Sequence, residues 1–126
     1  MKYLTTCKIL LFIIAIFITL PVSAKHKHLE KEYQEAWCKA HNGTIEYKLA
    51  DNTRVDCVTS DYAVEFDFAS KWAESIGQSL YYAQKTKRKP AVVLIMEQPA
   101  KDLKYLHRLY QVSNTIGIEV FIMSEL

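Results

Sequence analysis

Acidic side chains gather in two short strand-like runs near the middle of the chain. Asp56 lies in the run 54–59, and Glu65 and Asp67 lie in the run 62–68. Because successive side chains of a strand alternate between its two faces, Glu65 and Asp67 share one face and leave the phenylalanines on the other. If the runs pair as a hairpin, Asp56 lies beside Glu65. Carboxylate oxygens brought together in this way are hard ligands that suit Mg²⁺, with Mn²⁺ as the alternative ion.

A helix is predicted to follow these runs, with Ser70 as its N-cap. At roughly 100° per residue, Lys71, Gln78 and Tyr82 fall within about 20° of one line, so the helix presents a cation, an amide and a phenol together. Gly77 costs about 1 kcal/mol relative to alanine in mid-helix, which a close approach of another backbone would explain. The side chains expected to pack inward form a separate apolar stripe of Trp72, Ile76, Leu80 and Ala83.

Three short motifs follow one another on these predicted elements. They are RVD at 54–56, EFD at 65–67 and QSLYYA at 78–83. In this order they resemble the PD-(D/E)XK nuclease superfamily, and within it the RecB-like branch with a QxxxY motif on the helix after the catalytic strands. The resemblance also covers the order of elements through most of the chain. It implies a restriction-endonuclease-like α/β core.

The resemblance implies an Mg²⁺-dependent enzyme that hydrolyses the phosphodiester bonds of nucleic acid, DNA or RNA. Asp56 and Glu65 correspond to the two metal-binding acids of the family, and Asp67 would add a third carboxylate. Gln78 and Tyr82 correspond to the helical pair that fixes the nucleic-acid backbone or supports the metal ligands. Crowded acids of this kind favour a bound cation, because like charges oppose joint ionisation.

One position departs from the family pattern. The family has a lysine two residues after the second acid, and this chain has Asp67 there. Lys71 lies in the first turn of the predicted helix and can supply the missing amine, since migration of this lysine occurs in the superfamily. The superfamily also often adds an acid from its first helix to the metal site. Glu35 is the candidate for that acid here, with a solvated helix face as the alternative.

Two other classes of function stay open beside an active nuclease. The first is a catalytically inactive nuclease-fold module that binds nucleic acid or a protein. The second is a small, disulfide-stapled interaction protein whose acids face solvent.

The first 24 residues have the pattern of a secretory signal. Lys2 and Lys8 flank an apolar run at 9–20, and small residues suited to cleavage follow at 21–24. The run is shorter than the roughly 20 residues of a membrane-spanning helix. We therefore expect export to the periplasm or the medium, loss of the signal without a remaining membrane anchor, and a single domain over residues 25–126.

The exported part has little net charge. The chain has 16 basic and 14 acidic residues, and without Lys2 and Lys8 the two numbers are equal. This balance excludes a protein that coats nucleic acid through bulk positive charge. The KHKH segment at 25–28 is interpreted as a flexible basic tail in preference to a metal site.

Cys38 and Cys57 are the two cysteines of the exported part. Export favours a disulfide between them, with buried free thiols or a reactive cysteine as alternatives. The bridge would tie the first helix to the second strand, on the sheet face opposite the carboxylates. A loop of about 20 residues closed in this way stabilises a fold by roughly 3 kcal/mol.

The predicted order of elements is αβββαβαβ. An antiparallel meander of three strands precedes a parallel pair, and helices flank the mixed sheet. The expected ranges are helix 29–41, strands 44–49, 54–59 and 62–68, helix 70–86, strand 91–96, helix 100–112 and strand 118–123.

Overall fold

The computed structural model describes residues 25–126 and has the predicted order of elements. The predicted signal at 1–24 lies outside the described residues. The elements are α1 (Glu30–Ala40), β1 (Thr44–Lys48), β2 (Arg54–Val58), β3 (Tyr62–Phe68), the 3₁₀ turn η1 (Ala69–Lys71), α2 (Trp72–Thr86), β4 (Lys89–Ile95), α3 (Pro99–Ile116) and β5 (Glu119–Met123). None of the described helices is both long enough and apolar enough to cross a membrane.

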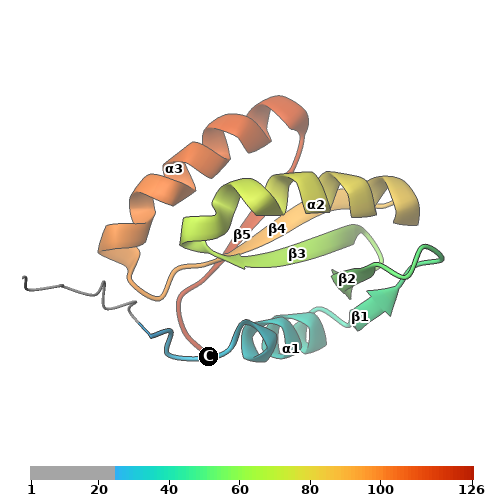
Figure 1. The fold of residues 1–126 in the computed structure, drawn as a ribbon, viewed down its shortest axis with the longest axis horizontal. Coiled ribbons are helices and arrows are strands. Elements are labelled where there is room, and N and C mark those ends of the chain that lie inside the picture. Colours follow the sequence, from blue (N-terminus) through green and yellow to red (C-terminus); the bar gives the residue numbers. More distant parts are fainter. Residues whose placement is uncertain (1–24) are drawn as a thin grey trace, which may run out of the picture.

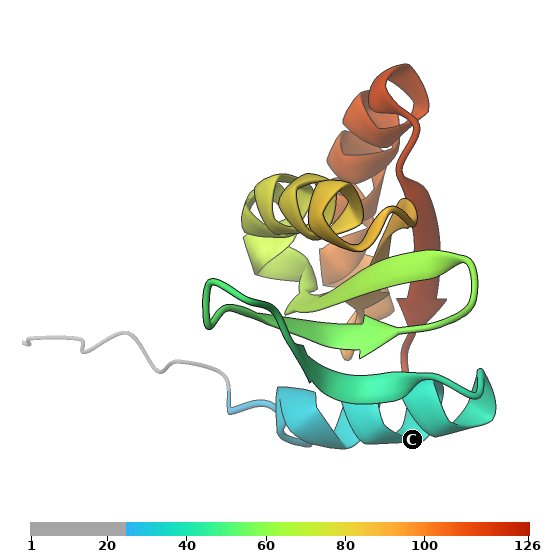
Figure 2. The ribbon, with the colours of Figure 1, turned by 90° about the vertical axis from the view of Figure 1, so that its right-hand side faces the viewer.

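The five strands form one mixed sheet in the order β1-β2-β3-β4-β5. β1, β2 and β3 are antiparallel neighbours, while β3, β4 and β5 run parallel. The predicted meander and parallel pair are therefore confirmed. α1 covers one face of the sheet, and α2 and α3 cover the other (Figures 1 and 2). β4 is buried on both faces from Ala91 to Ile95, as its uninterrupted apolar sequence indicates.

The face under α1 is apolar and carries the predicted disulfide. Tyr33 and Trp37 of α1 pack with Val64 and Phe66 of β3 in one core cluster. Cys38 and Cys57 form the predicted bridge across this cluster, with their Cα atoms 5.8 Å apart. A Cβ atom added at Gly43 would collide with both sulfur atoms, so only glycine fits beside the disulfide. The bridge thus fixes the end of α1 on the middle of the sheet.

The other face is partly polar, because α2 turns small side chains toward the sheet. Ser75 and Ser79 are fully buried, whereas Leu80 of the predicted apolar stripe is 38% exposed. Each serine hydroxyl donates to a carbonyl of its own helix, at 2.7 Å from Ser75 to Trp72 and at 2.9 Å from Ser79 to Ile76. The predicted stripe is therefore wrong at Leu80. Side chains as small as serine let the helix approach the sheet closely, and their hydroxyls need no partner from the sheet.

Two further predictions for α2 are wrong. The helix begins at Trp72 after a 3₁₀ turn, so Ser70 lies in that turn and makes no N-cap hydrogen bond. A Cβ added at Gly77 would meet nothing within 4 Å in the described chain. No close backbone approach therefore explains this glycine.

The segment predicted as a flexible tail is held against the sheet by Glu97. This carboxylate accepts hydrogen bonds from His26 Nδ1 at 2.9 Å, from the backbone N–H groups of Lys27 and His28 at 2.9 and 3.1 Å, and from the Tyr33 hydroxyl at 2.9 Å. The His26 ring also stacks on Phe68, with their centroids 3.5 Å apart. Glu97 is only 8% exposed. The sequence did not reveal this role, because the partners lie about 70 residues away.

Candidate active site

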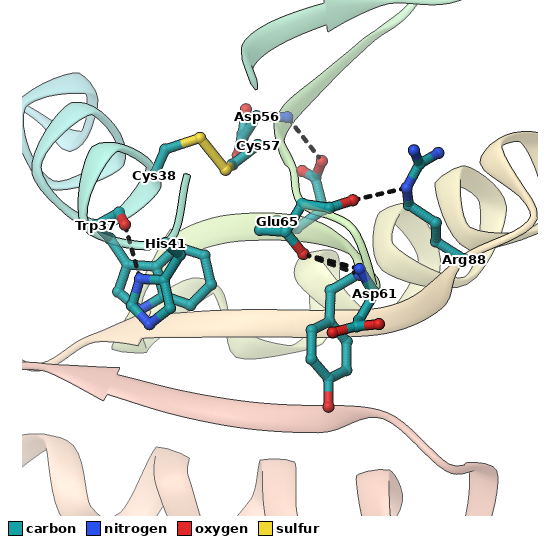
Figure 3. Close-up of a disulfide and its surroundings, with 10 residues drawn as sticks. Trp37, Cys38, His41, Asp56, Cys57, Asp61, Glu65 and Arg88 are labelled. Atoms are coloured by element: carbon teal, nitrogen blue, oxygen red, sulfur yellow. Dashed lines mark hydrogen bonds between the residues drawn. A yellow bond between two sulfur atoms is a disulfide. The ribbon is translucent and has the colours of Figure 1, made fainter. Parts of the chain in front are cut away.

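Asp56 and Glu65 lie side by side on β2 and β3. The register pairs Cys57 with Val64, which makes Asp56 and Glu65 the next neighbours in the ladder. At this point in the ladder, the carboxyl groups of Asp56 and Glu65 accept hydrogen bonds from backbone N–H groups of the neighbouring strand. Glu65 Oε1 accepts from the Asp56 N–H at 3.5 Å (Figure 3), and Asp56 Oδ2 accepts from the Phe66 N–H at 2.8 Å. The predicted contact between these two acids is therefore present in the structure.

The acids lie in surroundings that disfavour their charged forms. Glu65 is 3% exposed and Asp67 is 6% exposed. Burial raises the pKa of Glu65 and of Asp56, and the negative charges of neighbouring acids raise both further. Burial, followed by the charge of Glu30, raises the pKa of Asp67 to about 7. Burial and the charges of neighbouring acids therefore favour the protonated forms of Asp56 and Glu65 when no cation is bound.

Glu30 is the acid of α1 that lies within electrostatic range of this group. Its side chain is half-buried and accepts a hydrogen bond from Gln34 Nε2 at 3.2 Å. Its charge contributes to the raised pKa of Asp56, Glu65 and Asp67. Glu35, the acid expected from the sequence, is exposed and pairs with Lys31 at 3.8 Å. The signal for Glu30 was its helical spacing to the inward-facing Tyr33 and Trp37, which Glu35 lacks.

Lys71 lies in the 3₁₀ turn between β3 and α2. Its ammonium charge lowers the pKa of Asp67, opposing the larger effect of burial, and acts in the same direction on Glu30. Lys71 is therefore within electrostatic range of the acids, and its side chain remains exposed to solvent. An exposed amine beside buried acids can meet an anionic substrate from outside the protein.

Tyr82 and Gln78 of α2 have different surroundings. Tyr82 is 8% exposed and packs against Val55 and Ala63. Burial raises its pKa first, and the charges of Glu65 and Asp56 raise it further, so the phenol remains a neutral hydrogen-bond donor. Gln78 is exposed on the same helix. The structure thus brings Tyr82 to the acids and leaves the Gln78 amide facing solvent.

Mg²⁺ is the divalent ion that the sequence predicts for these acids. Within residues 25–126, no three His, Cys, Asp or Glu side chains converge closely enough to form a metal-binding group. Mg²⁺, however, is commonly held by one or two carboxylates and completes its octahedron with water and substrate phosphate. The neighbouring carboxyl groups of Asp56 and Glu65 match this number of carboxylate ligands, and Asp67 lies on the same strand face as Glu65.

Comparison of the chain with protein-family models, with curated proteins and with solved structures found no match.

Proposed function

We propose that this chain is an exported, Mg²⁺-dependent nuclease-like enzyme that hydrolyses phosphodiester bonds of nucleic acid. The observation that carries the proposal is the contact between half-buried Asp56 and buried Glu65, beside Asp67 and with the Lys71 ammonium within electrostatic range. The resemblance to the PD-(D/E)XK superfamily and the αβββαβ order of the first elements support it. The disulfide is compatible with an oxidising compartment, and the predicted signal supplies the route there.

In this proposal Asp56 and Glu65 hold the ion, and Asp67 adds negative charge behind them. The bound ion supplies Lewis-acid polarisation of the phosphodiester and lowers the pKa of a water molecule. The protein's part would be to give up the protons that burial favours on these carboxyl groups and to present both as anions. Ionisation of these carboxyl groups is costly in their buried surroundings when no cation is present, and it becomes favourable when a cation binds. Ionisation of the pair is therefore coupled to binding of the ion.

The remaining side chains act on the substrate. Lys71 would offset the charge that develops on the phosphate oxygens, since an ammonium close to the reacting group stabilises negative charge in the transition state. The neutral Tyr82 hydroxyl would donate to a ligand of the ion or to the nucleic-acid backbone. Gln78, facing solvent on the same helix, would contact the backbone further along the strand. Glu30 would complete the acidic surroundings in the place expected for Glu35.

Degradation of single- and double-stranded DNA and RNA by the purified chain, with Mg²⁺, with Mn²⁺ or with chelator, tests the proposal. Cleavage should require the ion and fall by about 10³-fold in Glu65→Ala and about 10²-fold in Lys71→Ala. Glu119→Ala and Lys101→Ala remove exposed charges on β5 and α3 and should retain activity. Comparing Glu30→Ala with Glu35→Ala identifies the acid of α1 that serves the site, and we expect the loss at Glu30.

Asp67 favours a second candidate, the inactive module, because it places a carboxylate where the family has its lysine. Binding of nucleic acid without cleavage in any metal would select that module. Absence of both nucleic-acid binding and divalent-ion binding would leave the disulfide-stapled interaction protein. Far-UV circular dichroism of each variant separates loss of activity from loss of fold.

A further inference from the structure

A second candidate site lies on the opposite face of the sheet, where four rings surround a small cavity. The cavity has a volume of about 130 Å³ and is lined by Trp37, His41, Thr59, Ser60, Asp61, Tyr62 and Phe121. The rings come from three elements: Trp37 and His41 from the last turn of α1, Tyr62 from β3 and Phe121 from β5. Trp37 and Tyr62 lie with their ring centroids 5.2 and 5.8 Å from that of Phe121.

The walls of this cavity are held in place before any ligand arrives. The Cys38–Cys57 bridge fixes the turn of α1 that carries Trp37 and His41. The turn between β2 and β3 is fixed by Thr59, whose Oγ1 accepts from the N–H groups of Asp61 and Tyr62 at 3.3 and 3.0 Å. A preorganised pocket loses little conformational freedom when it binds a ligand.

The polar groups of the pocket accept hydrogen bonds more than they donate them. His41 Nδ1 donates to the Trp37 carbonyl at 2.8 Å, which leaves Nε2 of the neutral ring as an acceptor. The Asp61 carboxylate has one side-chain contact, from the Ser60 hydroxyl at 3.4 Å. The ion pairs of residues 25–126 do not include Asp61. Arg88 instead donates to the Thr59 carbonyl at 2.7 Å, and its guanidinium points away from the Asp61 carboxylate (Figure 3).

Aromatic walls with one carboxylate and a ring nitrogen acceptor suit a flat cation with several N–H donors. We propose that this pocket binds the guanidinium group of an arginine side chain presented by a partner protein. A guanidinium stacks on aromatic rings and bonds to a carboxylate in the same plane, whereas an ammonium is more strongly hydrated and does not stack. The cavity has room for the end group alone and opens to solvent, so the rest of the partner lies outside it.

Three acetylated and amidated tripeptides, Gly-Arg-Gly, Gly-Lys-Gly and Gly-citrulline-Gly, test this pocket by NMR titration of the full exported chain. Citrulline keeps the shape of arginine and removes its charge. We expect shifts at the Trp37 indole and the Phe121 ring, with the arginine peptide binding about tenfold more tightly than the citrulline peptide. Asp61→Asn should abolish this preference, and Phe121→Leu should weaken binding of the arginine peptide. Glu74→Gln, an exposed acid on the other face, should change neither.

Equal binding of the citrulline and arginine peptides would overturn the proposal, and so would an unaltered preference in Asp61→Asn. Shifts confined to other residues, or no shift up to the solubility of the peptides, would also overturn it. Tighter binding of adenosine than of the arginine peptide would also overturn the proposal, because it would show that the pocket prefers an uncharged planar ring. The indole signal of Trp72, which packs on the other face of the sheet, keeps its position when Asp61→Asn and Phe121→Leu are folded. Loss of fold is therefore recognised in the same spectra. The outcome does not depend on whether the chain cleaves nucleic acid.

Discussion

Glu65 and Glu97 are both buried glutamates, yet their surroundings are opposite. Glu65 is 3% exposed and Glu97 is 8% exposed. Glu97, on the α1 side of the sheet, accepts four hydrogen bonds. Glu65, on the α2 side, accepts one long backbone bond at 3.5 Å and lies beside other acids. Burial raises the pKa of Glu65, with Asp56 next in effect. Burial of Glu97 also raises its pKa, but hydrogen bonds from His28, His26, Lys27 and Tyr33 lower it by more, so the pKa of Glu97 is lowered overall.

The difference separates a structural carboxylate from one suited to a ligand. A buried charge that receives four donors stabilises the fold, because its lost hydration is replaced. A buried acid beside other acids opposes folding whenever it is ionised. The chain therefore tolerates an unfavourable group at Glu65, and the proposed cation would replace what is missing there. Four experiments bear on this contrast.

The largest effect is expected at Glu97. Glu97→Ala removes the acceptor of four hydrogen bonds and leaves the Tyr33 hydroxyl unpaired in the core, so we expect a loss of about 3 kcal/mol in the free energy of unfolding. Urea denaturation at pH 7 measures it. The amide protons of Lys27 and His28 should also exchange faster with solvent. A stability equal to that of the wild type would show that Glu97 does not anchor the segment.

Divalent ions should stabilise the folded chain through Glu65. At about 100 times its dissociation constant, a ligand that binds only the folded state adds about 2.7 kcal/mol. Thermal unfolding with increasing Mg²⁺ or Mn²⁺ should show this gain in the wild type and in Glu35→Gln, and not in Glu65→Gln. A gain of equal size in Glu65→Gln would place the ion elsewhere.

Without metal, Glu65→Gln should make the chain more stable, by about 2 kcal/mol at pH 8. The folded-state pKa of Glu65 lies above its unfolded value, so the folded state holds more protons and stability falls as pH rises from the unfolded toward the folded pKa. The pKa of Asp67 acts in the same direction, between its ordinary value of 3.8 and about 7. The pH dependence of stability that Glu97 produces has the opposite sign. Because the pKa of Glu97 is lowered in the folded state, the stability that it contributes is lost as pH falls. Chemical denaturation between pH 4 and pH 9 measures both slopes, and a wild-type slope unchanged in Glu65→Gln would contradict the assignment.

The smallest effect is expected at Gly77, which contacts neither glutamate. Gly77→Ala should stabilise the chain by about 1 kcal/mol, because alanine favours the helix and the added Cβ meets nothing within 4 Å. The pH slope should stay that of the wild type. Differential scanning calorimetry provides the measurement, and destabilisation would indicate a contact made only in solution.

Most of the fold could be predicted from sequence patterns that extend over a few residues. Alternation in β3 indicated that Val64 and Phe66 face one core and Glu65 and Asp67 the other. The continuous apolar run at 91–96 indicated a strand buried on both faces. The chemistry of Cys38 and Cys57 led to the bridge between α1 and β2. Predictions failed where tertiary packing outweighed local preference, as at the exposed Leu80 and at His26, which a carboxylate 71 residues away holds in place.

By itself the sequence determined which side chains are available for chemistry and the order of the elements that carry them. Strand and helix periods are local properties of the chain, so the faces of β3 and the site candidates Asp56, Glu65 and Tyr82 could be predicted from it. Only the tertiary structure brought the charge of Glu30 within range of these acids, because that distance depends on how α1 docks against the sheet. It also decided that Glu97 receives four hydrogen-bond donors whereas Glu65 receives one and lies beside other acids, since the pKa of a buried group depends on donors and charges that distant segments bring to it.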